Sequence, residues 1–264
     1  MTVRLAATEY GPERDADAAP LAILHGLFGS GRNWASVAQR LAARRRVVCF
    51  DLRNHGASAW SGGMQYGEMA EDVLAALDER GWRRAALLGH SMGGKTAMMA
   101  ALRDPDMVDR LVIIDIAPVA YPSRHLPLLR AMRALDLSGI TRRSEADRLL
   151  ASDVPDAAER GFLLQNLVFQ DGRADWRLNL EAIERTMPDL VGFPSVPDNA
   201  VYRGPALFVG GGRSDYLLSE YEPAIRRLFP EVRIERIADA GHWVHAEAPA
   251  AFLQIVEPFL AGAV

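Results

Sequence analysis

Short, unbroken apolar runs alternate with helix-like segments along this chain, and no other feature of the sequence restricts the fold as strongly. Each run is typical of a strand that is buried on both faces, as the strands of a parallel sheet are. The segment 69–77 has apolar residues at helical spacing, and Gly81 follows as a helix stop. Strands that alternate with helices predict an α/β fold with a mostly parallel central sheet flanked by helices. The apolar runs are 21–24, 47–50, 85–88 and 111–114.

A helical insertion interrupts this alternation. Residues 118–204 contain helix-like stretches but no convincing strand, and the alternation resumes at Pro205. We therefore expect an α/β core made of residues 1–117 and 205–264, with residues 118–204 forming a helical cap inserted between two strands. The helices expected in the cap are 126–137, 144–150, 157–169 and 178–185. Beyond the cap we expect strands near 206–209 and 232–237, and helices near 221–228 and from Pro249.

Charge and composition argue against several classes of protein. The 30 basic and 34 acidic residues give a net charge of −4 without a strongly basic stretch, so we expect no nucleic-acid binding. No window approaches the roughly 18 consecutive apolar residues of a membrane span, and the N-terminus lacks the pattern of a secretory signal. We therefore expect a cytoplasmic protein without a membrane partner, while the sequence gives no indication of its oligomeric state. The single cysteine, Cys49, is expected to be a buried small hydrophobe.

The pentapeptide Gly-His-Ser-Met-Gly at residues 89–93 lies between the predicted strand 85–88 and a segment rich in helix formers. A serine at the tip of a sharp strand-to-helix turn is held in strained backbone geometry, where neighbouring side chains would collide. Glycines two residues before and two residues after Ser91 remove those collisions. The N-terminus of the following helix supplies partial positive charge where an oxyanion would develop. The pattern therefore predicts Ser91 as a nucleophile.

A competing pattern overlaps this turn. Residues from Gly89 to Thr96 also read Gly-x-x-x-x-Gly-Lys-Thr, the phosphate-binding loop of NTPases. Asp115 after the strand 111–114 would then match the acidic residue that helps to hold magnesium. Against a nucleotide-binding protein, the motif lies on the third interior strand, and no base-recognition segment is apparent. The pattern also leaves His25-Gly26 and Gly241-His242 unexplained.

A serine nucleophile needs a histidine that accepts its proton and an acid that orients this histidine. In a serine hydrolase with this strand–turn–helix motif, the chain order is serine, acid, histidine. His242 follows the last predicted strand, and Gly241 gives the backbone the freedom to approach Ser91, so His242 is the predicted general base. His245 could form a metal pair with His242, but no third ligand has suitable spacing. We therefore expect a structural role for His245 and no bound metal.

The loop His-Gly-Leu-Phe-Gly at 25–29 follows the first interior strand and is the predicted oxyanion loop. We expect the backbone amides of Leu27 and Met92 to hold the negative oxygen of the substrate together. A tight strand-to-helix turn would account for the same residues on structural grounds, and the two roles are compatible.

With these residues identified, the chain resembles the α/β-hydrolase superfamily over nearly its full length. It is most similar to the branch of bacterial YbfF-type esterases and thioesterases, to which the eukaryotic abhydrolase-domain-11 proteins are similar. Six motifs in the same order carry the resemblance, and together they are far more specific than any one alone. They are His-Gly-Leu-Phe-Gly-Ser at 25–30, Asp-Leu-Arg-Asn-His-Gly-Ala-Ser at 51–58, Gly-His-Ser-Met-Gly-Gly-Lys at 89–95, Ile-Asp-Ile-Ala-Pro at 114–118, Gly-Gly-Arg-Ser at 211–214 and Gly-His-Trp-Val-His at 241–245.

The resemblance implies that the chain hydrolyses carboxylic esters, or acyl thioesters, through an acyl-enzyme on Ser91, with no metal or organic cofactor. It also implies that the cap covers the active site and supplies much of the pocket for a small-molecule substrate. Hydrolysis of carbon–carbon bonds, perhydrolysis and amide cleavage stay open, because a fold does not fix a reaction. A binding protein on a decayed hydrolase scaffold is disfavoured, since the serine, the histidine and the candidate acids are all present.

Two acids compete for the role of orienting His242. Many α/β-hydrolases place this acid after the strand that follows the cap, where Asp215 lies. In the branch that the chain resembles, the acid follows the strand before the cap instead, and a serine occupies the later position. Asp115 and Ser214 match that arrangement, so we favour Asp115 as the acid, with Ser214 as an accessory hydrogen-bonding partner. Asp51 is a weaker candidate, because its surroundings look like a structural turn.

Substrate-binding positions are expected at His25, Phe28, Tyr121 and Trp243. Further large apolar side chains are candidates for the pocket, although such residues in helices more often belong to the core. These further candidates are Trp60, Phe162, Phe169, Trp176 and Met187.

Overall fold

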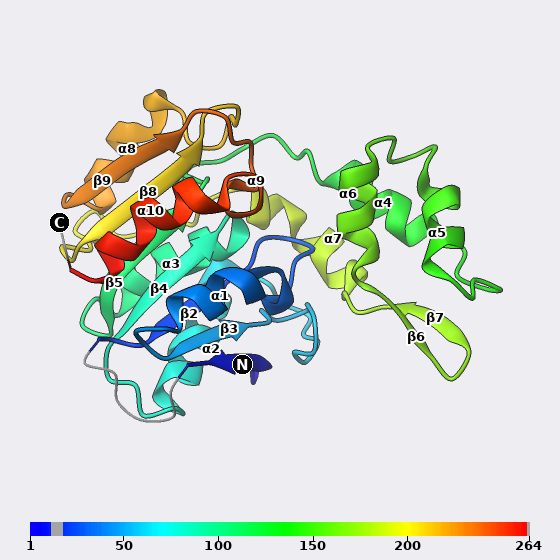
Figure 1. The fold of residues 1–264 in the computed structure, drawn as a ribbon, viewed down its shortest axis with the longest axis horizontal. Coiled ribbons are helices and arrows are strands. Elements are labelled where there is room, and N and C mark those ends of the chain that lie inside the picture. Colours follow the sequence, from blue (N-terminus) through cyan, green and yellow to red (C-terminus); the bar gives the residue numbers. More distant parts are fainter. Residues whose placement is uncertain (12–17, 263–264) are drawn as a thin grey trace.

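The computed structural model describes residues 1–11 and 18–262, and its centre is one sheet of seven strands (Figure 1). The strand order is β1-β3-β2-β4-β5-β8-β9; β1 is antiparallel to β3, and all other neighbours are parallel. This confirms the predicted α/β class with a mostly parallel sheet. The strands are β1 (Ala7–Tyr10), β2 (Leu21–Leu24), β3 (Val47–Phe50), β4 (Ala85–His90), β5 (Val108–Ile114), β8 (Ala206–Gly211) and β9 (Val232–Ile237).

The first strand, β1, is absent from the sequence-based expectation. Its side chains are mostly exposed, because it forms an edge of the sheet, so it lacks the apolar run that marks the interior strands. The interior strands β2, β3 and β4 are buried along their whole length, which is why their apolar runs identified them.

Helices cover both faces of the sheet (Figure 1). Alternate residues of each strand belong to two separate apolar clusters: Ile23 belongs to the cluster that includes α1 and α10, whereas Leu24 belongs to the cluster that includes α2, α3 and α8. Cys49 is buried in the first of these clusters, as expected. The helices are α1 (Ala35–Leu41), preceded by the short η1 (Gly31–Trp34), α2 (Tyr66–Asp78), α3 (Met92–Arg103), α8 (Glu222–Leu228), preceded by η2 (Ser219–Tyr221), α9 (Val244–Glu247) and α10 (Pro249–Leu260).

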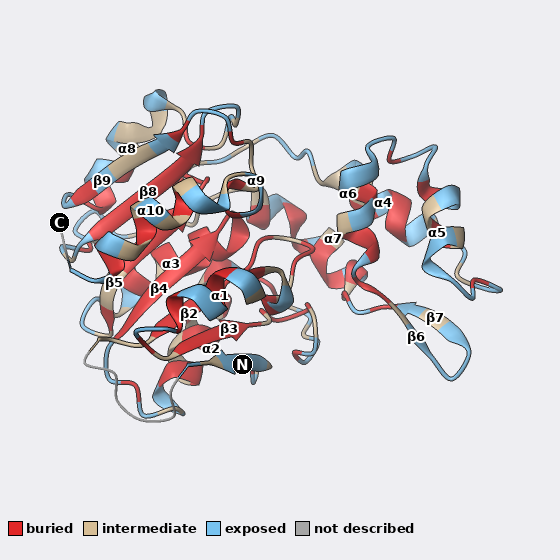
Figure 2. Ribbon diagram, in the orientation of Figure 1, coloured by how far each residue is buried: buried red, intermediate tan, exposed pale blue. Residues whose placement is uncertain are grey.

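The segment between β5 and β8, which we call the inserted segment, forms a separate group of elements beside the sheet (Figure 1). It contains α4 (Leu126–Ala134), α5 (Arg143–Leu150), α6 (Ala157–Leu164) and α7 (Leu180–Val191). Figure 2 shows buried positions on the inner sides of these helices and exposed positions on their outer sides. No helix among the described residues combines the length and the apolar character needed to cross a bilayer.

The expectation that this segment has no strand is wrong. The expected helix 157–169 ends at Leu164, and the chain continues as a hairpin of β6 (Leu167–Gln170) and β7 (Arg173–Trp176). The turn consists of Asp171 (φ 50°) and Gly172 (φ 74°), and positive φ at both central residues is the geometry of a type I′ turn. The Asp-Gly pair is the sequence signal of this hairpin, and the predicted helix extended to the residues just before it.

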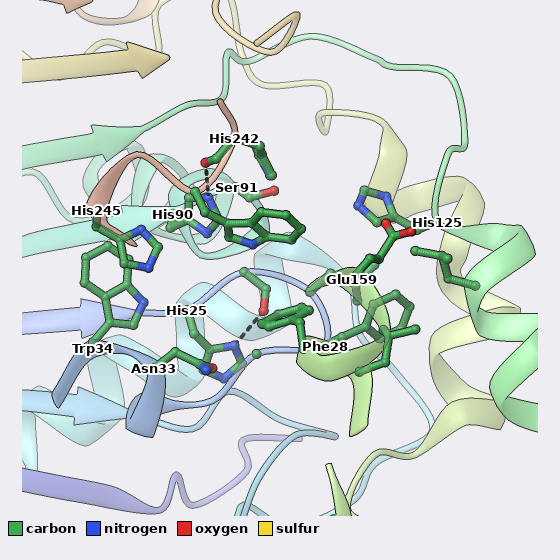
Figure 3. Close-up of a pocket in the computed structure, with 17 residues that line it drawn as sticks. His25, Phe28, Asn33, Trp34, His90, Ser91, His125, Glu159, His242 and His245 are labelled. Carbon is green, nitrogen blue, oxygen red and sulfur yellow. Dashed lines mark hydrogen bonds between the residues drawn. The ribbon is translucent and has the colours of Figure 1, made fainter. Parts of the chain in front are cut away.

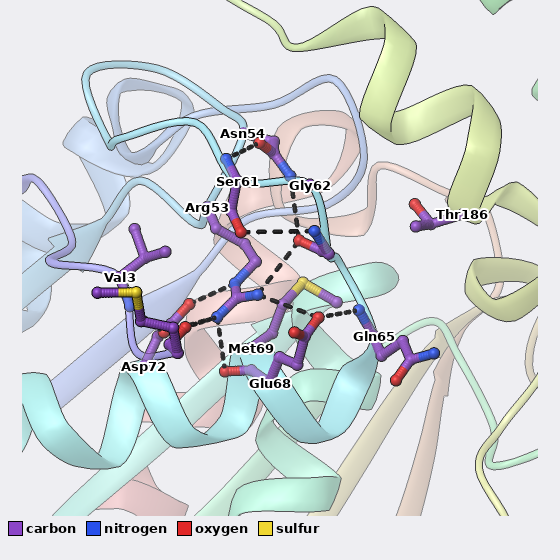
Figure 4. A network of polar contacts seen from close by, with 12 residues as sticks. Val3, Arg53, Asn54, Ser61, Gly62, Gln65, Glu68, Met69, Asp72 and Thr186 are labelled. Atoms are coloured by element: carbon purple, nitrogen blue, oxygen red, sulfur yellow. Dashed lines mark hydrogen bonds and ion pairs between the residues drawn. The ribbon is translucent and has the colours of Figure 1, made fainter.

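A buried ionic network fixes the loop between β3 and α2 (Figure 4). The Arg53 guanidinium is fully buried and donates to both carboxylate oxygens of Asp72, at 2.6 and 2.9 Å. It also forms an ion pair with Glu68 at 3.1 Å. Asn54 in this loop accepts a hydrogen bond at its carbonyl from the amide of Asn179, at 3.1 Å, so the loop is also tied to the start of α7. The next residue, His55, therefore lies in a segment that is fixed both by the Arg53 network and by the hydrogen bond to Asn179.

Candidate active site

Ser91 occupies the turn between β4 and α3. Its backbone has φ 52° and ψ −118°, a strained conformation for a residue with a side chain. The turn requires glycine on both sides: a Cβ on Gly89 would lie 2.2 Å from the carbonyl oxygen of Gly93, and a Cβ on Gly93 would lie 2.4 Å from that of Leu24. The Ser91 amide donates to the carbonyl of Ile114 at 3.0 Å, which ties the turn to the neighbouring strand β5.

His242 and Asp115 meet at the carboxyl ends of the strands. The ring of His242 is hydrogen-bonded through Nδ1 to Oδ2 of Asp115 at 2.7 Å. Asp115 is fully buried; the amide of Gly211 donates to its Oδ1 at 2.9 Å, and the hydroxyl of Ser214 donates to its Oδ2. Because an ionised carboxylate only accepts hydrogen bonds, we assign the proton of His242 to Nδ1, which leaves Nε2 free to accept a proton.

The other candidate acids lie elsewhere. The Asp215 side chain is 64% exposed and forms an ion pair with Arg124 at 3.1 Å. The Asp51 carboxylate accepts hydrogen bonds from the amides of Gly31 and Ala57, at 2.7 and 2.8 Å, and so closes the loop structure around it. Of the three acids, Asp115 is the one that contacts His242.

The predicted oxyanion loop forms a tight turn. The amide of Gly29 donates to the carbonyl of Gly26 at 3.0 Å, and Phe28 has φ 61°, which is the geometry of a type II turn with Leu27 at its second position. The turn hydrogen bond does not use the Leu27 amide. Met92 is the first residue of α3, and the amide of a first helical residue has no acceptor within its own helix. Both amides that we expect in the oxyanion hole are therefore left without a partner by the local backbone.

Two buried histidines hold this turn from behind. Nε2 of His25 accepts from the amide of Leu52 at 2.9 Å, so its Nδ1 carries the proton and donates to the Gly26 carbonyl at 2.8 Å. His55 has the same tautomer: Nε2 accepts from the amide of Phe28 at 3.2 Å, and Nδ1 donates to the carbonyl of Arg53 at 3.0 Å. Burial lowers the pKa of His25 to about 4 and that of His55 to about 3, so both rings are neutral at pH 7.

Two cavities meet at Ser91, and both are also bordered by Leu27 and His125. The first, which we call the His242 cavity, encloses about 550 Å³ including its open mouth. The second, which we call the Lys95 cavity, encloses about 410 Å³ on the same basis. Besides the shared residues, the His242 cavity is lined by His25, Gly26, Phe28, Gly29, Asn33, Trp34, His90, Leu128, Glu159, Phe162, Leu163, His242, Trp243 and His245. The Lys95 cavity is lined by Tyr66, Met92, Lys95, Ile116, Tyr121, Pro122, Met187, Leu190, Val191 and Tyr216.

The residues expected to bind substrate all border these cavities. His25, Phe28 and Trp243 line the His242 cavity, and Tyr121 lines the Lys95 cavity. Both ring nitrogens of His25 are hydrogen-bonded to the backbone, so the ring can contact a substrate by packing but not by a hydrogen bond. Only some of the further apolar candidates line a cavity. Phe162 and Met187 line the cavities, Trp60 and Phe169 are exposed, and Trp176 is buried within the inserted segment.

Two polar residues of the inserted segment line the cavities but were not identified from the sequence. His125 borders both cavities, and Glu159 lines the His242 cavity across from His245 and Trp34 (Figure 3). Burial raises the pKa of Glu159 and lowers the pKa of His125 to about 4. Both residues come from the inserted segment, whose sequence gives no sign of which helix faces Ser91. Only the three-dimensional arrangement identifies them.

The side chains that resembled part of a nucleotide or metal site contact the protein itself. Lys95 donates to the carbonyls of Val119, Val191 and Gly192, and the hydroxyl of Thr96 donates to the carbonyl of Met92 at 3.0 Å. A phosphate-binding loop would instead direct both side chains at the phosphates and their magnesium. His245 stacks on Trp34 with ring centroids 3.9 Å apart. Within residues 1–11 and 18–262, no group of three or more His, Cys, Asp or Glu side chains is placed to hold a metal.

Comparison with known proteins decides the family. A family model described as the alpha/beta hydrolase fold matches residues 19–249. The chain belongs to the α/β-hydrolase family. This hydrolase is 42% identical to the sn-1-specific diacylglycerol lipase ABHD11 of Mus musculus over 255 residues, which cover 94% of this chain and 82% of the mouse protein. It is 37% identical to the esterase YbfF of Escherichia coli strain K12, with 91% and 92% of the two chains covered.

A solved structure agrees with these relatives. The hydrolase superposes on a marine microorganism esterase with a TM-score of 0.93 at 34% identity, and the match covers 98% of this chain and 100% of the esterase. The branch of the family that the motifs indicated is therefore confirmed.

Proposed function

We propose that this hydrolase cleaves carboxylic esters through an acyl-enzyme on Ser91. The observation that carries the proposal is the 2.7 Å hydrogen bond between Nδ1 of His242 and the buried Asp115 carboxylate, beside a serine held in a strained strand-to-helix turn. The names of the relatives, an esterase and a diacylglycerol lipase, support ester hydrolysis. The same site could also hydrolyse acyl thioesters by this mechanism, and the acyl-CoA assay described below tests this.

The proposed reaction has two halves. Oγ of Ser91 attacks the ester carbonyl carbon while Nε2 of His242 takes the hydroxyl proton, and Asp115 stabilises the resulting imidazolium. The amides of Leu27 and Met92 hold the negative oxygen of the tetrahedral intermediate. The intermediate expels the alcohol, which takes the proton from His242, and leaves an ester on Ser91. Water then attacks this ester while His242 again accepts a proton. The bond between the acyl carbon and Oγ of Ser91 breaks, Oγ takes the proton back from His242, and the carboxylic acid leaves.

The positions of the two cavities support an assignment of the two ends of the substrate. The leaving alcohol takes its proton from His242, so it must lie on the side of Ser91 that His242 borders, in the His242 cavity. The acyl chain then lies on the other side, in the Lys95 cavity, where Met92 is also found. The Lys95 cavity is largely apolar, with Ile116, Met187 and Leu190 in its walls, which suits an aliphatic acyl chain.

A fluorophosphonate probe and p-nitrophenyl acetate test this proposal on the wild type and on Ser91→Ala. We expect one equivalent of probe on the wild type, and we expect the variant to lose both labelling and ester turnover. Turnover that survives in a folded Ser91→Ala variant would refute the acyl-enzyme. A series of acyl-CoA thioesters, run beside oxygen esters of the same acyl chains, then measures whether thioesters are substrates.

A further inference from the structure

Lys95 is a buried lysine one helical turn after the nucleophile. Its side chain is 1% exposed, and its backbone amide donates to the carbonyl of Ser91 at 3.0 Å. Its ammonium group donates to three carbonyls, those of Val119, Val191 and Gly192, at 2.8, 3.1 and 2.5 Å. An ammonium group has three N–H donors, so all of them are engaged by the backbone. Burial lowers the pKa of Lys95 to about 7, and the three carbonyls favour its charged form.

The three carbonyls belong to the two connections between the core and the inserted segment. Val119 lies where the chain leaves β5, and Val191 and Gly192 lie where α7 ends and the chain turns back towards β8. The last carbonyls of a helix have no partner within it and carry the negative end of the helix dipole. Lys95 therefore caps α7 from a different helix, α3, and holds the outgoing connection at the same point.

Two tyrosines complete this cluster. The amide of Tyr121 donates to the carbonyl of Val191 at 2.9 Å and so joins the two connections directly. The hydroxyl of Tyr66 donates to the carbonyl of Leu190 at 2.6 Å. The Lys95 ammonium lies 4.8 Å from the ring centroid of Tyr121 and 5.7 Å from that of Tyr66, within the range of cation–π attraction.

The same residues line the Lys95 cavity. Lys95, Tyr66, Tyr121 and Val191 line it together with Met187 from α7. A displacement of either connection would therefore change the shape of the cavity. Because α3 begins directly after Ser91, the contacts of Lys95 with the two connections also fix these lining residues relative to the nucleophile.

We propose that Lys95 is a positioning residue, which clamps the two connections of the inserted segment to the nucleophile helix and so sets the shape of the acyl side of the site. The proposal rests on the ester hydrolysis and the acyl assignment proposed above. Lys95 does not touch the reacting atoms, since its donors are all occupied, and it acts through the carbonyls that it holds. Its effect should therefore depend on the length of the acyl chain.

The test compares Lys95→Met, Lys95→Gln and Lys95→Arg with the wild type on p-nitrophenyl acetate and p-nitrophenyl octanoate. Methionine has a similar length without donors, glutamine has two N–H donors without a charge, and arginine keeps a cation with several donors. We expect the ratio of KM for octanoate to KM for acetate to rise about tenfold in Lys95→Met, less in Lys95→Gln and least in Lys95→Arg, because displacements of about 1 Å have effects of this order or larger. Arg103→Met is the matched control, since Arg103 is an exposed cation at the end of the same helix and pairs with Glu71 rather than with the inserted segment.

Labelling by the fluorophosphonate probe separates this proposal from the proposed function. A variant that still labels at Ser91 but shows the wild-type KM ratio would overturn the clamp and leave ester hydrolysis intact. A uniform loss of turnover on both esters in Lys95→Met and Lys95→Gln would also overturn it, because the effect would then not lie on the acyl side. If Lys95→Met does not fold, the ratio in Lys95→Gln decides the question, with thermal unfolding as the check on folding.

Discussion

The amide of Phe28 donates to Nε2 of His55 at 3.2 Å, although the two residues are 27 positions apart in the chain. This contact joins the turn that carries Leu27 to the loop that the Arg53 network fixes. The turn that carries the Leu27 amide, which we propose for the oxyanion hole, is thus held by His55, a residue that does not line either cavity.

Replacing this histidine should slow the chemical step. In His55→Phe the ring shape is kept but the acceptor for the Phe28 amide is lost, so the turn is no longer held in one position. Loss of a whole oxyanion donor costs about 100- to 1,000-fold in kcat, and we expect loss of its support to lower kcat about 10-fold or more with a smaller change in KM. Steady-state kinetics on p-nitrophenyl acetate measures both. An unchanged kcat in the folded variant would show that the turn holds its shape without His55.

The two candidate acids provide a matched pair of variants. Asp115→Asn removes the charge that faces Nδ1 of His242 and allows the wrong tautomer of the imidazole, and changes of this kind lower kcat about 10,000-fold. Asp215→Asn removes an exposed carboxylate that pairs with Arg124, and we expect its kcat to stay within about threefold of the wild type, as an exposed ion pair has little effect. The same ester assay measures both variants. The reverse order of effects would move the acid role to Asp215.

A pair of variants also tests the two cavities. Met187→Trp adds volume to a side chain that lines the Lys95 cavity, which leaves less room for a long acyl chain. We expect the ratio of kcat/KM for octanoate to kcat/KM for acetate to fall about tenfold. Phe162→Ala removes an aromatic ring in the His242 cavity, whose centroid lies 5.6 Å from the ring centroid of Trp243. It should instead change the preference among acetate esters with different alcohols. If each variant altered the selectivity at the opposite end of the substrate, the assignment of the two cavities would be reversed.

Much of the fold and of the site could be predicted because the signals are local. The runs that became β2 and β3 had the predicted bounds, since a strand buried on both faces is apolar throughout. The serine turn is equally local, because Gly89 and Gly93 are required by contacts within a few residues of Ser91 or on a neighbouring strand.

The remaining features depend on contacts between distant segments. Asp115 and Asp215 both follow a strand, and only the position of the His242 loop distinguishes them in space. Nothing in the sequence indicated the partners of Lys95, because they lie 24 and 96 or more positions away. His125 and Glu159 belong to the inserted segment, and their orientation towards Ser91 follows from how its helices pack.

Four buried histidines should make the protein sensitive to acid. Burial lowers the pKa of His25 to about 4, of His55 and His245 to about 3, and of His90 well below its ordinary value. An unfolded histidine titrates near 6.5, so the unfolded chain binds protons between about pH 6.5 and pH 4 that the folded chain does not bind. Stability therefore falls as the pH falls through this window, by up to about 1.4 kcal/mol per pH unit for each such histidine.

His245→Phe isolates one of these contributions. The ring of His245 stacks on Trp34, and its Nδ1 is buried without a hydrogen-bond partner among the described residues. Phenylalanine keeps the stacking and removes both the unpaired nitrogen and the proton that the unfolded chain takes up. We expect the variant to be at least as stable as the wild type at pH 8, and its advantage to grow by about 2 kcal/mol at pH 5. Urea unfolding at the two pH values measures the difference. An advantage that is the same at pH 5 and pH 8 would show that burial does not lower the pKa of His245 in the folded protein.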